Sequence, residues 1–404
     1  MKWLKWCGKP AFVSFLMRLL KTEFSGGAGS FLQVCLIAGL LFCMFVPPVV
    51  HGFESRTRKL VVGVRIDAPP FSACKHVPEL ADQGEDTKYV CSASETQDSG
   101  DKYWGYTVDL CKRIAHRAVE DEGLYCGVEY KEVSSLDRFE MLKDKKIDML
   151  CGASTVTLER MRICDFTLFT FLSGASMMYK ELSSVEKKES IKDNFTVGAL
   201  QNTTTRAQVD KIVNILQENQ SEFSSVELNQ VKIMTFSSHY EGMQALQDDK
   251  INAYIADKEI LLALQKLNEK IFIKSKAAMN KVPENENTNG DTLKSADHPG
   301  LVELKVLQNY FTVEPYAIGI SLGNPDLRFV ANSVLSELFI LDQGKEDSIS
   351  AILQKNFPGK TFSKSLENMF RLQQLSMGKR VADDFLPRIS RQECNDYLKG
   401  QSEE

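Results

Sequence analysis

The sequence has no excess of basic residues, and this limits the functions it can serve. Its 404 residues contain 49 Lys and Arg against 54 Asp and Glu, which gives a net charge of −5. Five of those basic residues and one acidic residue lie in positions 1–52, so the remainder carries a net charge of about −9. Nucleic acids attract basic surfaces. We therefore expect no nucleic-acid partner.

The sequence also lacks any C-x-x-C pair among its ten cysteines, so it has no sign of a metal-binding knuckle. We expect neither a metal ion nor another cofactor. Composition otherwise suits globular material, with 43% hydrophobic and 25% charged residues. The chain is long enough for one large domain or two medium ones.

One long apolar run stands at the N-terminus. Phe31 to Val50 carries no charge, and the residues before it include five Lys or Arg and one Glu. This pattern predicts export. Residues 1–52 form either a signal peptide cleaved near Gly52, which we favour, or an uncleaved membrane anchor, since about 20 apolar residues can cross a bilayer. The rest of the protein is then expected on the periplasmic or extracellular side of the membrane.

Seven cysteines remain after residue 52, and in an oxidising compartment they are expected to form disulfides. Cys74 and Cys91 flank a polar loop and are one candidate pair. Cys111 lies in a predicted helix and Cys151 at the end of a predicted strand, positions that fall on the same edge of an α/β sheet. We favour that pairing over Cys111 with Cys126, which would join opposite ends of one helix. The odd total leaves at least one thiol unpaired.

The first half of the exported chain alternates predicted strands and helices. This order is typical of a parallel, doubly wound sheet, in which ligands bind beyond the carboxyl ends of the strands. The predicted strands are Lys59–Ile66, Val128–Val133 and Ile147–Cys151, and the predicted helices are Tyr106–Val119 and Leu136–Leu142.

Polar side chains follow each of these three strands. Arg65 ends the first strand, Ser135 and Arg138 follow the second, and Thr155 and Arg160 follow the third. Because parallel strands end at one edge of a sheet, these side chains are expected to lie close together. Arginines and hydroxyls suit a carboxylate or a phosphate.

The stretch after Ile147–Cys151 is predicted to be a small-residue turn that leads into a short polar helix. The helix would carry Thr155 and Arg160 in its first turns, and its free backbone N–H groups would add to an anion site. The alternative is an ordinary capped helix with a solvated arginine.

A second strand and helix cycle begins near Phe195, so we expect a second α/β lobe and a cleft between the two lobes. Its polar turn contains Thr203 and Thr204, His239 follows a predicted strand, and Asp257 ends another. The predicted strands are Phe195–Leu200, Val231–Phe236 and Ala253–Ala256, and the predicted helices are Arg206–Glu218, Tyr240–Leu246 and Glu259–Leu267.

Several motifs occur in an order found in a known family. They are a strand ending in PPF at Phe71, GYTVDL at Gly105, a T-x-x-x-x-R element from Thr155 to Arg160, a TTT turn, AYIAD and EPYAIGI. With these motifs the chain resembles, from about Lys59 to Gly359, the extracytoplasmic solute-binding proteins of family 3 that serve polar amino-acid ABC importers. The nearest match is the glutamate/aspartate-binding branch.

The resemblance implies the α/β fold of type 2 periplasmic binding proteins. In that fold each of two lobes is a mostly parallel sheet flanked by helices, and two crossover strands connect the lobes. Residues 58–168 and 313–360 would form the first lobe and residues 169–312 the second. Residues 361–404 would be a polar, helical tail without a core of its own.

The resemblance also implies a set of ligand-binding residues. Arg160 with Thr155 would clamp the α-carboxylate of an amino acid, and Arg65 and Arg138 would pair with a side-chain carboxylate. Asp257 is the expected partner of the α-ammonium group.

The remaining positions of the implied ligand set lie in both lobes. Ser135 also matches a contact position, His239 would close on the ligand from the second lobe, and Thr203 and Thr204 belong to the second-lobe turn. Ala153 stands where that branch has a serine, so one hydroxyl is missing there while the backbone groups remain.

The resemblance implies a small amino acid as ligand, an ABC permease as partner, a monomeric state and no enzymatic activity. A membrane-anchored sensor ectodomain is an alternative, because residues 1–52 could act as an anchor. An enzyme similar to cyclohexadienyl dehydratase is another, although no acid is clearly placed for proton transfer. An ion channel would need membrane helices between the lobe segments, and Phe166 to Lys192 is neither long nor apolar enough.

Overall fold

The computed structural model describes residues 58–74, 100–180, 195–218, 231–279, 303–339 and 348–374. The apolar run Phe31–Val50 and most of the predicted tail lie outside these residues. Within the described ranges, none of the helices combines the length and the apolar character that a membrane crossing requires.

The first lobe is built on a five-stranded sheet in which four strands point the same way and β13 runs against them. Three of its strands, at residues 60–64, 128–132 and 149–151, follow predicted strands. Side chains of β1 alternate between the two faces, with buried Val62 in one core cluster and partly buried Val61 packed against another. In spatial order the strands are β5 (Val128–Glu132), β1 (Leu60–Val64), β6 (Met149–Cys151), β13 (Glu314–Ser321) and β7 (Cys164–Ser173).

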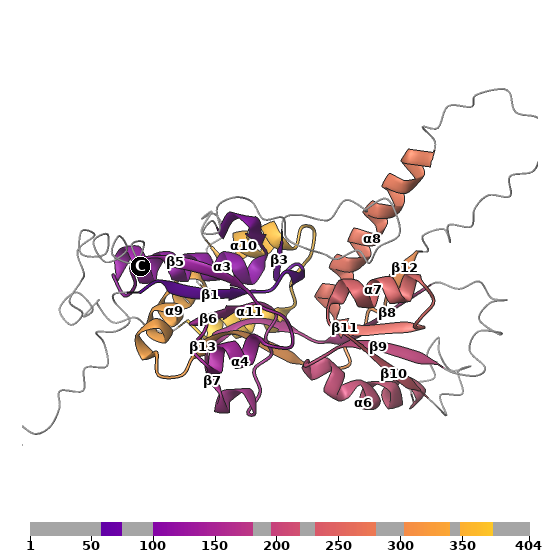
Figure 1. Cartoon of the computed structure of the whole chain (residues 1–404), viewed down its shortest axis with the longest axis horizontal. Helices are drawn as coiled ribbons and strands as arrows, with labels where there is room; N and C mark the ends of the chain where they lie inside the picture. The colour runs from indigo at the N-terminus through magenta and orange to yellow at the C-terminus, as the bar shows by residue number, and fades with distance from the viewer. Residues whose placement is uncertain are drawn as a thin grey trace, which may run out of the picture. The chain divides into compact units, whose positions relative to one another are not determined.

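Helices cover both faces of the first sheet (Figure 1). α3 (Tyr106–His116) and α9 (Pro325–Leu338) contribute Ile114 and Leu335 to the larger core cluster, while α4 (Arg138–Lys143) contributes Leu142 to the smaller one. The helix predicted at Tyr106–Val119 is confirmed, and its last part continues as a π-helical turn.

The second lobe repeats this architecture. Four of its five strands point the same way, and β8 runs against them. α6 (Thr204–Glu218) packs on one face, and α7 (His239–Gln247) and α8 (Lys258–Met279) pack on the other. The strands in order are β10 (Lys232–Phe236), β9 (Thr196–Leu200), β11 (Ala253–Asp257), β8 (Ala175–Lys180) and β12 (Leu304–Val306).

Two adjacent segments carry the chain between the sheets. β7 passes into β8 through Gly174, and the chain returns from β12 to β13. The two segments are hydrogen-bonded, because Ala175 N donates to Thr312 Oγ1 at 2.8 Å and Phe311 N donates to Ala175 O at 2.8 Å. The structure is therefore the two-lobed α/β fold with two crossovers that the sequence predicts.

A small antiparallel sheet holds the end of β1 in place. It consists of β2 (Asp67–Ala68), β3 (Ser72–Cys74) and β4 (Tyr103–Trp104), with a cis Pro69–Pro70 peptide in the turn. Phe71 of this turn packs edge-on against Phe171 at a centroid distance of 5.0 Å. The turn that follows Arg65 is thus fixed to the core by an aromatic contact.

The cysteines agree with the favoured pairing. Cys111 and Cys151 form a disulfide with an S–S distance of 2.03 Å, which confirms that prediction. Cys74 is disulfide-bonded, but Cys91 lies outside the described residues, so their pairing stays a prediction. Cys126 is also disulfide-bonded, and Cys164 is a buried free thiol.

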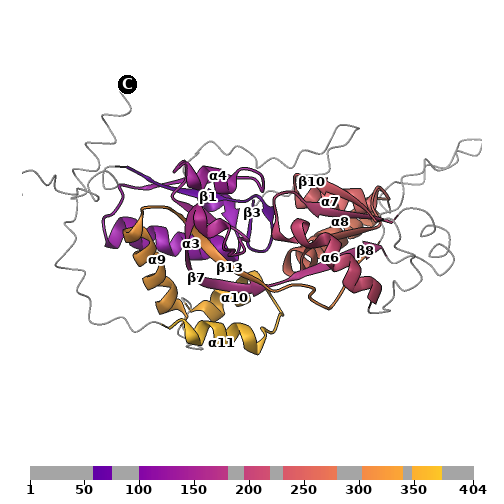
Figure 2. The ribbon, with the colours of Figure 1, turned by 90° about the horizontal axis from the view of Figure 1, so that it is seen from below.

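The first part of the predicted tail packs onto the first lobe. After α10 (Ile349–Asn356), α11 (Lys364–Leu372) buries Leu366 and Phe370 in the larger core cluster. Gln373, just after α11, exchanges hydrogen bonds with the backbone of Phe169 in β7. Figure 2 shows α11 along the side of the first lobe that carries β7. The segment up to residue 374 thus extends the core of the first lobe.

Candidate functional site

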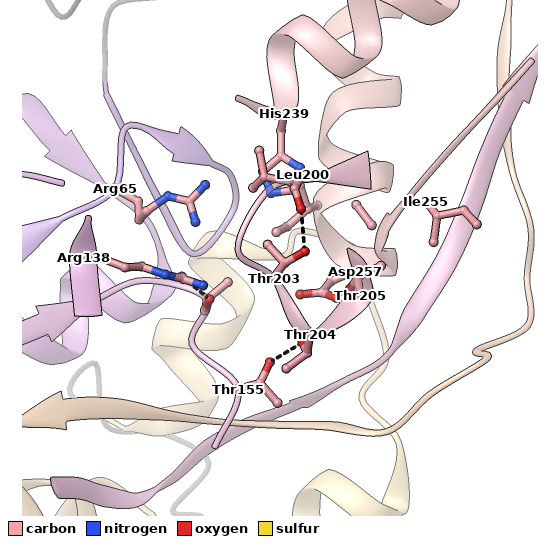
Figure 3. Close-up of a pocket in the computed structure, with 13 residues that line it drawn as sticks. Arg65, Arg138, Thr155, Leu200, Thr203, Thr204, Thr205, His239, Ile255 and Asp257 are labelled. Carbon is pink, nitrogen blue, oxygen red and sulfur yellow. Dashed lines mark hydrogen bonds between the residues drawn. The ribbon is translucent and has the colours of Figure 1, made fainter. Parts of the chain in front are cut away.

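A pocket lined by residues of both lobes contains most of the predicted site (Figure 3). Its empty volume, which includes space open to solvent, is about 360 Å³. From the first lobe it is lined by Arg65, Arg138, Ala153 and Thr155. From the second lobe it is lined by Thr203, Thr204, His239 and Asp257.

Two predicted site residues do not line this pocket. Ser135 is buried, and among the described residues its hydroxyl has no hydrogen-bond partner. Arg160 donates from Nη1 to the carbonyl oxygen of Thr155 at 2.7 Å, and its guanidinium stacks over Phe139 at 4.4 Å from the ring centroid. Arg160 therefore braces the backbone behind Thr155 in this structure.

The segment that carries Thr155 is not the predicted helix. Thr155 forms a β-bridge with Tyr316, and Val156 N donates to Pro315 O at 2.8 Å. Only a three-residue 3₁₀ turn, Arg160–Arg162, follows. The prediction of a helix N-terminus with free N–H groups is wrong, because the backbone of this segment is hydrogen-bonded to β13 instead.

Arg65 forms a buried ion pair within its own turn. It directly follows β1, and its backbone N–H donates to Ser72 Oγ at 3.0 Å. Its Nε donates to Asp67 Oδ1 at 2.8 Å. Nη2 lies 2.6 Å from the same oxygen, close enough for the ion pair but without hydrogen-bond geometry. Asp67 thus holds the guanidinium at the pocket wall.

Arg138 is also buried, but among the described residues it forms no ion pair. It begins α4, and its Nη1 donates to the neutral carbonyl oxygen of Ala153 at 3.0 Å. Its Nε has no hydrogen-bond partner among the described residues. Burial lowers the pKa of this guanidinium well below its ordinary value, and the nearby charges of Arg65 and Arg160 lower it further. An anion in the pocket would relieve this penalty.

Asp257 is the acidic residue of the lining. It ends β11 and accepts hydrogen bonds from the Tyr316 hydroxyl and from Thr205 Oγ1, the latter at 3.0 Å. Burial raises the pKa of Asp257 to about 6, and the nearby Glu314 raises it as well. A cationic group beside Asp257 would favour its ionised form.

The turn before α6 completes the second-lobe wall. Thr203 caps the helix, because its Oγ1 accepts the N–H of Arg206 at 3.1 Å. Thr204 Oγ1 donates to Glu314 Oε2 at 2.8 Å and lies 3.3 Å from Thr155 Oγ1 of the first lobe. Asn202, just before this turn, takes the left-handed conformation with φ 53°, which Asn tolerates better than most residues other than Gly.

His239 is a neutral donor or acceptor at this wall. It begins α7, whose N-cap Ser238 accepts the N–H of Glu241. Its Nδ1 lies 3.0 Å from the Tyr254 hydroxyl. Burial lowers the pKa of His239 to about 3, so the ring is uncharged at neutral pH. The backbone N–H of His239 donates to Asp67 Oδ2 at 3.3 Å, which links the two lobes.

Sequence reasoning missed several residues of the site. Leu200, Ile255 and Ile260 line the pocket, but apolar residues in predicted strands and helices are ordinarily core. Asp67 was missed although it lies two residues after Arg65, because only the folded turn brings the two side chains together. Across the described ranges, no group of three or more His, Cys, Asp or Glu is placed to hold a metal ion.

Several known proteins are similar to this chain. It is 26% identical over 165 residues to a glutamine-binding protein of Geobacillus stearothermophilus, covering 41% of this chain and 56% of that protein. It is 26% identical over 245 residues to the ABC transporter glutamine-binding protein GlnH of Bacillus subtilis (strain 168), covering 61% of this chain and 70% of GlnH.

Two solved structures are similar at lower identity. An ancestral arginine-binding protein bound to glutamine is 22% identical, with a TM-score of 0.47 and coverage of 74% of this chain and 97% of that one. The cysteine-binding protein from Campylobacter jejuni is 18% identical, with a TM-score of 0.45 and coverage of 74% and 89%.

The family match is more extensive than these pairwise similarities. Residues 91–339, more than half of the chain, match the bacterial extracellular solute-binding proteins, family 3. This range includes most of the pocket lining, from Arg138 to Asp257. The chain belongs to the bacterial extracellular solute-binding proteins of family 3.

Proposed function

We propose that this protein binds a small amino acid in the pocket between its lobes, with glutamate and aspartate preferred, and delivers it to an ABC importer. The observation that carries the proposal is the set of charged groups in the lining. Two guanidinium groups, Arg65 and Arg138, and one carboxyl group, Asp257, line the pocket. Glutamate and aspartate present the complementary set of two carboxylates and one ammonium group.

The polarity of the two walls orients such a ligand. The guanidinium groups of Arg65 and Arg138 point from the first lobe toward the second-lobe residues Thr203 and His239 (Figure 3). Asp257 lies on the second-lobe wall with its pKa raised by burial, so an ammonium group beside it would form an ion pair and favour its ionised form. Carboxylates are expected at the arginines and the α-ammonium at Asp257.

The position of Arg160 changes one expected role. In this structure Arg160 donates to Thr155 O, while Arg138 faces the pocket with an unsatisfied Nε. We therefore assign the first contact with a carboxylate to Arg138. Arg160 would reach the ligand only by giving up its bond to Thr155.

Contacts from both lobes provide a basis for ligand-driven closure. A ligand favours the closed state only if it binds that state better, and lining residues from both lobes supply this difference. Delivery to an importer, the monomeric state and the location outside the cytoplasm are parts of the proposal. Whether residues 1–52 are removed decides between a free carrier and an anchored sensor, and mass spectrometry of the mature N-terminus would distinguish them.

Isothermal titration with glutamate, aspartate, glutamine and arginine tests the ligand class. We expect the tightest binding for the two acidic amino acids, weaker binding for glutamine and none for arginine. Arg138→Gln should weaken glutamate binding by a factor of about 100, because a buried charge pair is lost. Arg328→Gln, which removes an exposed guanidinium paired with Asp165, should leave it unchanged. Heat with arginine alone contradicts the acidic-ligand proposal.

A second candidate function follows from Asp257 itself. A buried carboxyl group with a pKa of about 6 in a ligand pocket is suited to proton transfer near neutral pH, as a cyclohexadienyl-dehydratase-like enzyme would require. Incubation with prephenate and detection of phenylpyruvate tests this function. Turnover that disappears in Asp257→Asn would establish the enzyme, and absence of product at high protein concentration would exclude it.

A further inference from the structure

We propose that Asp67 is a specificity-determining residue of this pocket: by pairing with Arg65 it compensates one of the two guanidinium charges in the wall and so limits the preference for dicarboxylic over monocarboxylic amino acids. The inference rests on the proposed function, since it concerns how strongly the same site distinguishes glutamate from glutamine.

Arg65 and Arg138 differ in the groups that they contact. Asp67 Oδ1 accepts a hydrogen bond from Arg65 Nε at 2.8 Å and lies 2.6 Å from Arg65 Nη2. Arg138, in contrast, contacts the neutral Ala153 O and forms no ion pair with a carboxylate among the described residues. A ligand carboxylate therefore meets one guanidinium that is paired with a carboxylate and one that, among the described residues, is not.

Asp67 is fixed behind the wall and does not line the pocket. Asp67 is only 6% exposed and belongs to β2 of the small sheet. Its second oxygen, Oδ2, accepts the N–H of His239, the first residue of α7, at 3.3 Å. A carboxylate held at both oxygens cannot turn toward the ligand, so it acts on the ligand only through its charge and through Arg65.

The charge on Asp67 persists at neutral pH. Burial alone would raise the pKa of Asp67, but Arg65 beside it and the N–H of His239 together hold the pKa below its ordinary value. The positive end of α7 also favours the ionised carboxylate. Three other ionisable groups are coupled to Asp67. His239 is uncharged at neutral pH, and the charge of Asp67 raises the pKa of Arg138 and of Tyr254.

A purely orienting role for Asp67 predicts the opposite result. If Asp67 only positions Arg65, its loss misplaces a donor that a side-chain carboxylate needs, and glutamate should lose more affinity than glutamine. If Asp67 compensates charge, its loss leaves Arg65 with a full positive charge, and glutamate should gain relative to glutamine. The direction of change in the ratio of the two dissociation constants decides between them.

The experiment is titration of the full exported chain with glutamate and with glutamine, in wild type and variants. In Asp67→Asn the ratio of the glutamine Kd to the glutamate Kd should rise about tenfold, the size of a change of one charge near a carboxylate in a partly screened site. In Arg65→Gln the ratio should fall by a similar factor, because Asp67 is then uncompensated. In the double variant, whose pair again has no net charge, the ratio should return close to the wild-type value.

A matched control removes an equally buried carboxylate elsewhere in the first lobe. Asp148 is 1% exposed and binds Arg58 with two hydrogen bonds of 2.6 Å, away from the pocket lining. Asp148→Asn should lower the melting temperature without changing the glutamate to glutamine ratio.

The outcomes separate this inference from the proposed function. An unchanged or reduced preference for glutamate in Asp67→Asn overturns the role of Asp67 while binding itself stands. No heat with any amino acid in the wild type contradicts the proposed function instead. If Asp67→Asn does not fold, adding it to Arg65→Gln must raise the ratio above that of Arg65→Gln alone, and failure to do so overturns the inference.

Discussion

Tyr316 donates its hydroxyl hydrogen to Asp257, although the two residues belong to different sheets, Tyr316 to β13 and Asp257 to β11. Tyr316 is itself 1% exposed and packs against Phe71 of the small sheet at a centroid distance of 5.1 Å. The carboxyl group in the pocket lining is thus held by a residue anchored in the other lobe. Its environment therefore depends on how the two lobes meet.

The first prediction concerns pH and the stability of the ligand-free protein. The pKa of Asp257 is raised from 3.8 to about 6, so the folded protein binds this proton more tightly than the unfolded chain. The resulting stabilisation is present in full below the unfolded pKa and is lost as the pH rises through 6. Between acid and neutral pH, the unfolding free energy of the wild type should fall by up to about 3 kcal/mol relative to that of Asp257→Asn. Urea unfolding at pH 4 and pH 7.5 measures the difference, and an equal gap at both pH values would contradict the assignment.

The second prediction concerns a buried carboxylate at the crossover. Glu259 in α8 accepts hydrogen bonds from Ser173, from Tyr310 at 2.6 Å and from Lys360 at 2.5 Å. Glu259→Gln removes the negative charge that pairs with Lys360. Chemical unfolding should show that the variant is less stable by about 2–4 kcal/mol.

An exposed pair provides the control for Glu259. Asp144 and Lys146 form an ion pair of 3.1 Å in which both side chains are about half exposed. Asp144→Asn should change the unfolding free energy by less than about 0.5 kcal/mol. Equal effects of the two variants would show that burial of Glu259 contributes nothing.

The third prediction concerns the disulfide between α3 and β6. Cys111 and Cys151 are separated by 40 residues, so their bond restricts a substantial loop of the unfolded chain. Replacing both with alanine should lower the unfolding free energy by about 2–4 kcal/mol. Cys164→Ala, which removes a buried free thiol and no disulfide, should cost about 1 kcal/mol. A double variant as stable as Cys164→Ala would refute the prediction.

The fourth prediction concerns Gly174 at the junction of β7 and β8. A Cβ atom there would lie 2.1 Å from Thr312 O and 2.9 Å from the Tyr310 ring, so the two crossover segments would have to separate. Gly174→Ala should destabilise by more than about 2 kcal/mol. At Gly127 the nearest atom to a new Cβ is Lys59 Cγ at 3.7 Å. Gly127→Ala should stay within about 1 kcal/mol of wild type, and thermal unfolding of both variants compares them.

Much of the fold could be predicted because it depends on local apolar patterns. The strands β1 and β6 and the helix α3 follow from runs of mostly buried residues, whereas β5 has only the partly buried Val128 and Tyr130. Each of the three strands confirms the prediction within a few residues. The Cys111–Cys151 bond follows from the same alternation, since a helix and a strand of known order fix which edge their cysteines share.

The rest depends on contacts between distant segments. Thr155 was predicted to start a helix, yet Thr155, Val156 and Thr157 are all β-branched, and β-branched residues favour the extended pairing with β13 that forms. No local pattern indicates that Tyr316 reaches Asp257. The same holds for α11, whose Phe370 packs on Phe339, just after α9, at a centroid distance of 4.7 Å.

The place of β13 in the first sheet has a consequence for how the chain folds as it is made. β13 lies between β6 and β7, yet it is synthesised after all five strands of the second sheet. Until residue 321 has emerged, β6 has one open edge and β7 has no partner strand in this sheet. Their unpaired backbone groups invite wrong pairing. The strands of the second lobe all fall between residues 175 and 306, so that lobe can complete first. The lobe whose synthesis begins first is thus the one whose sheet is completed last.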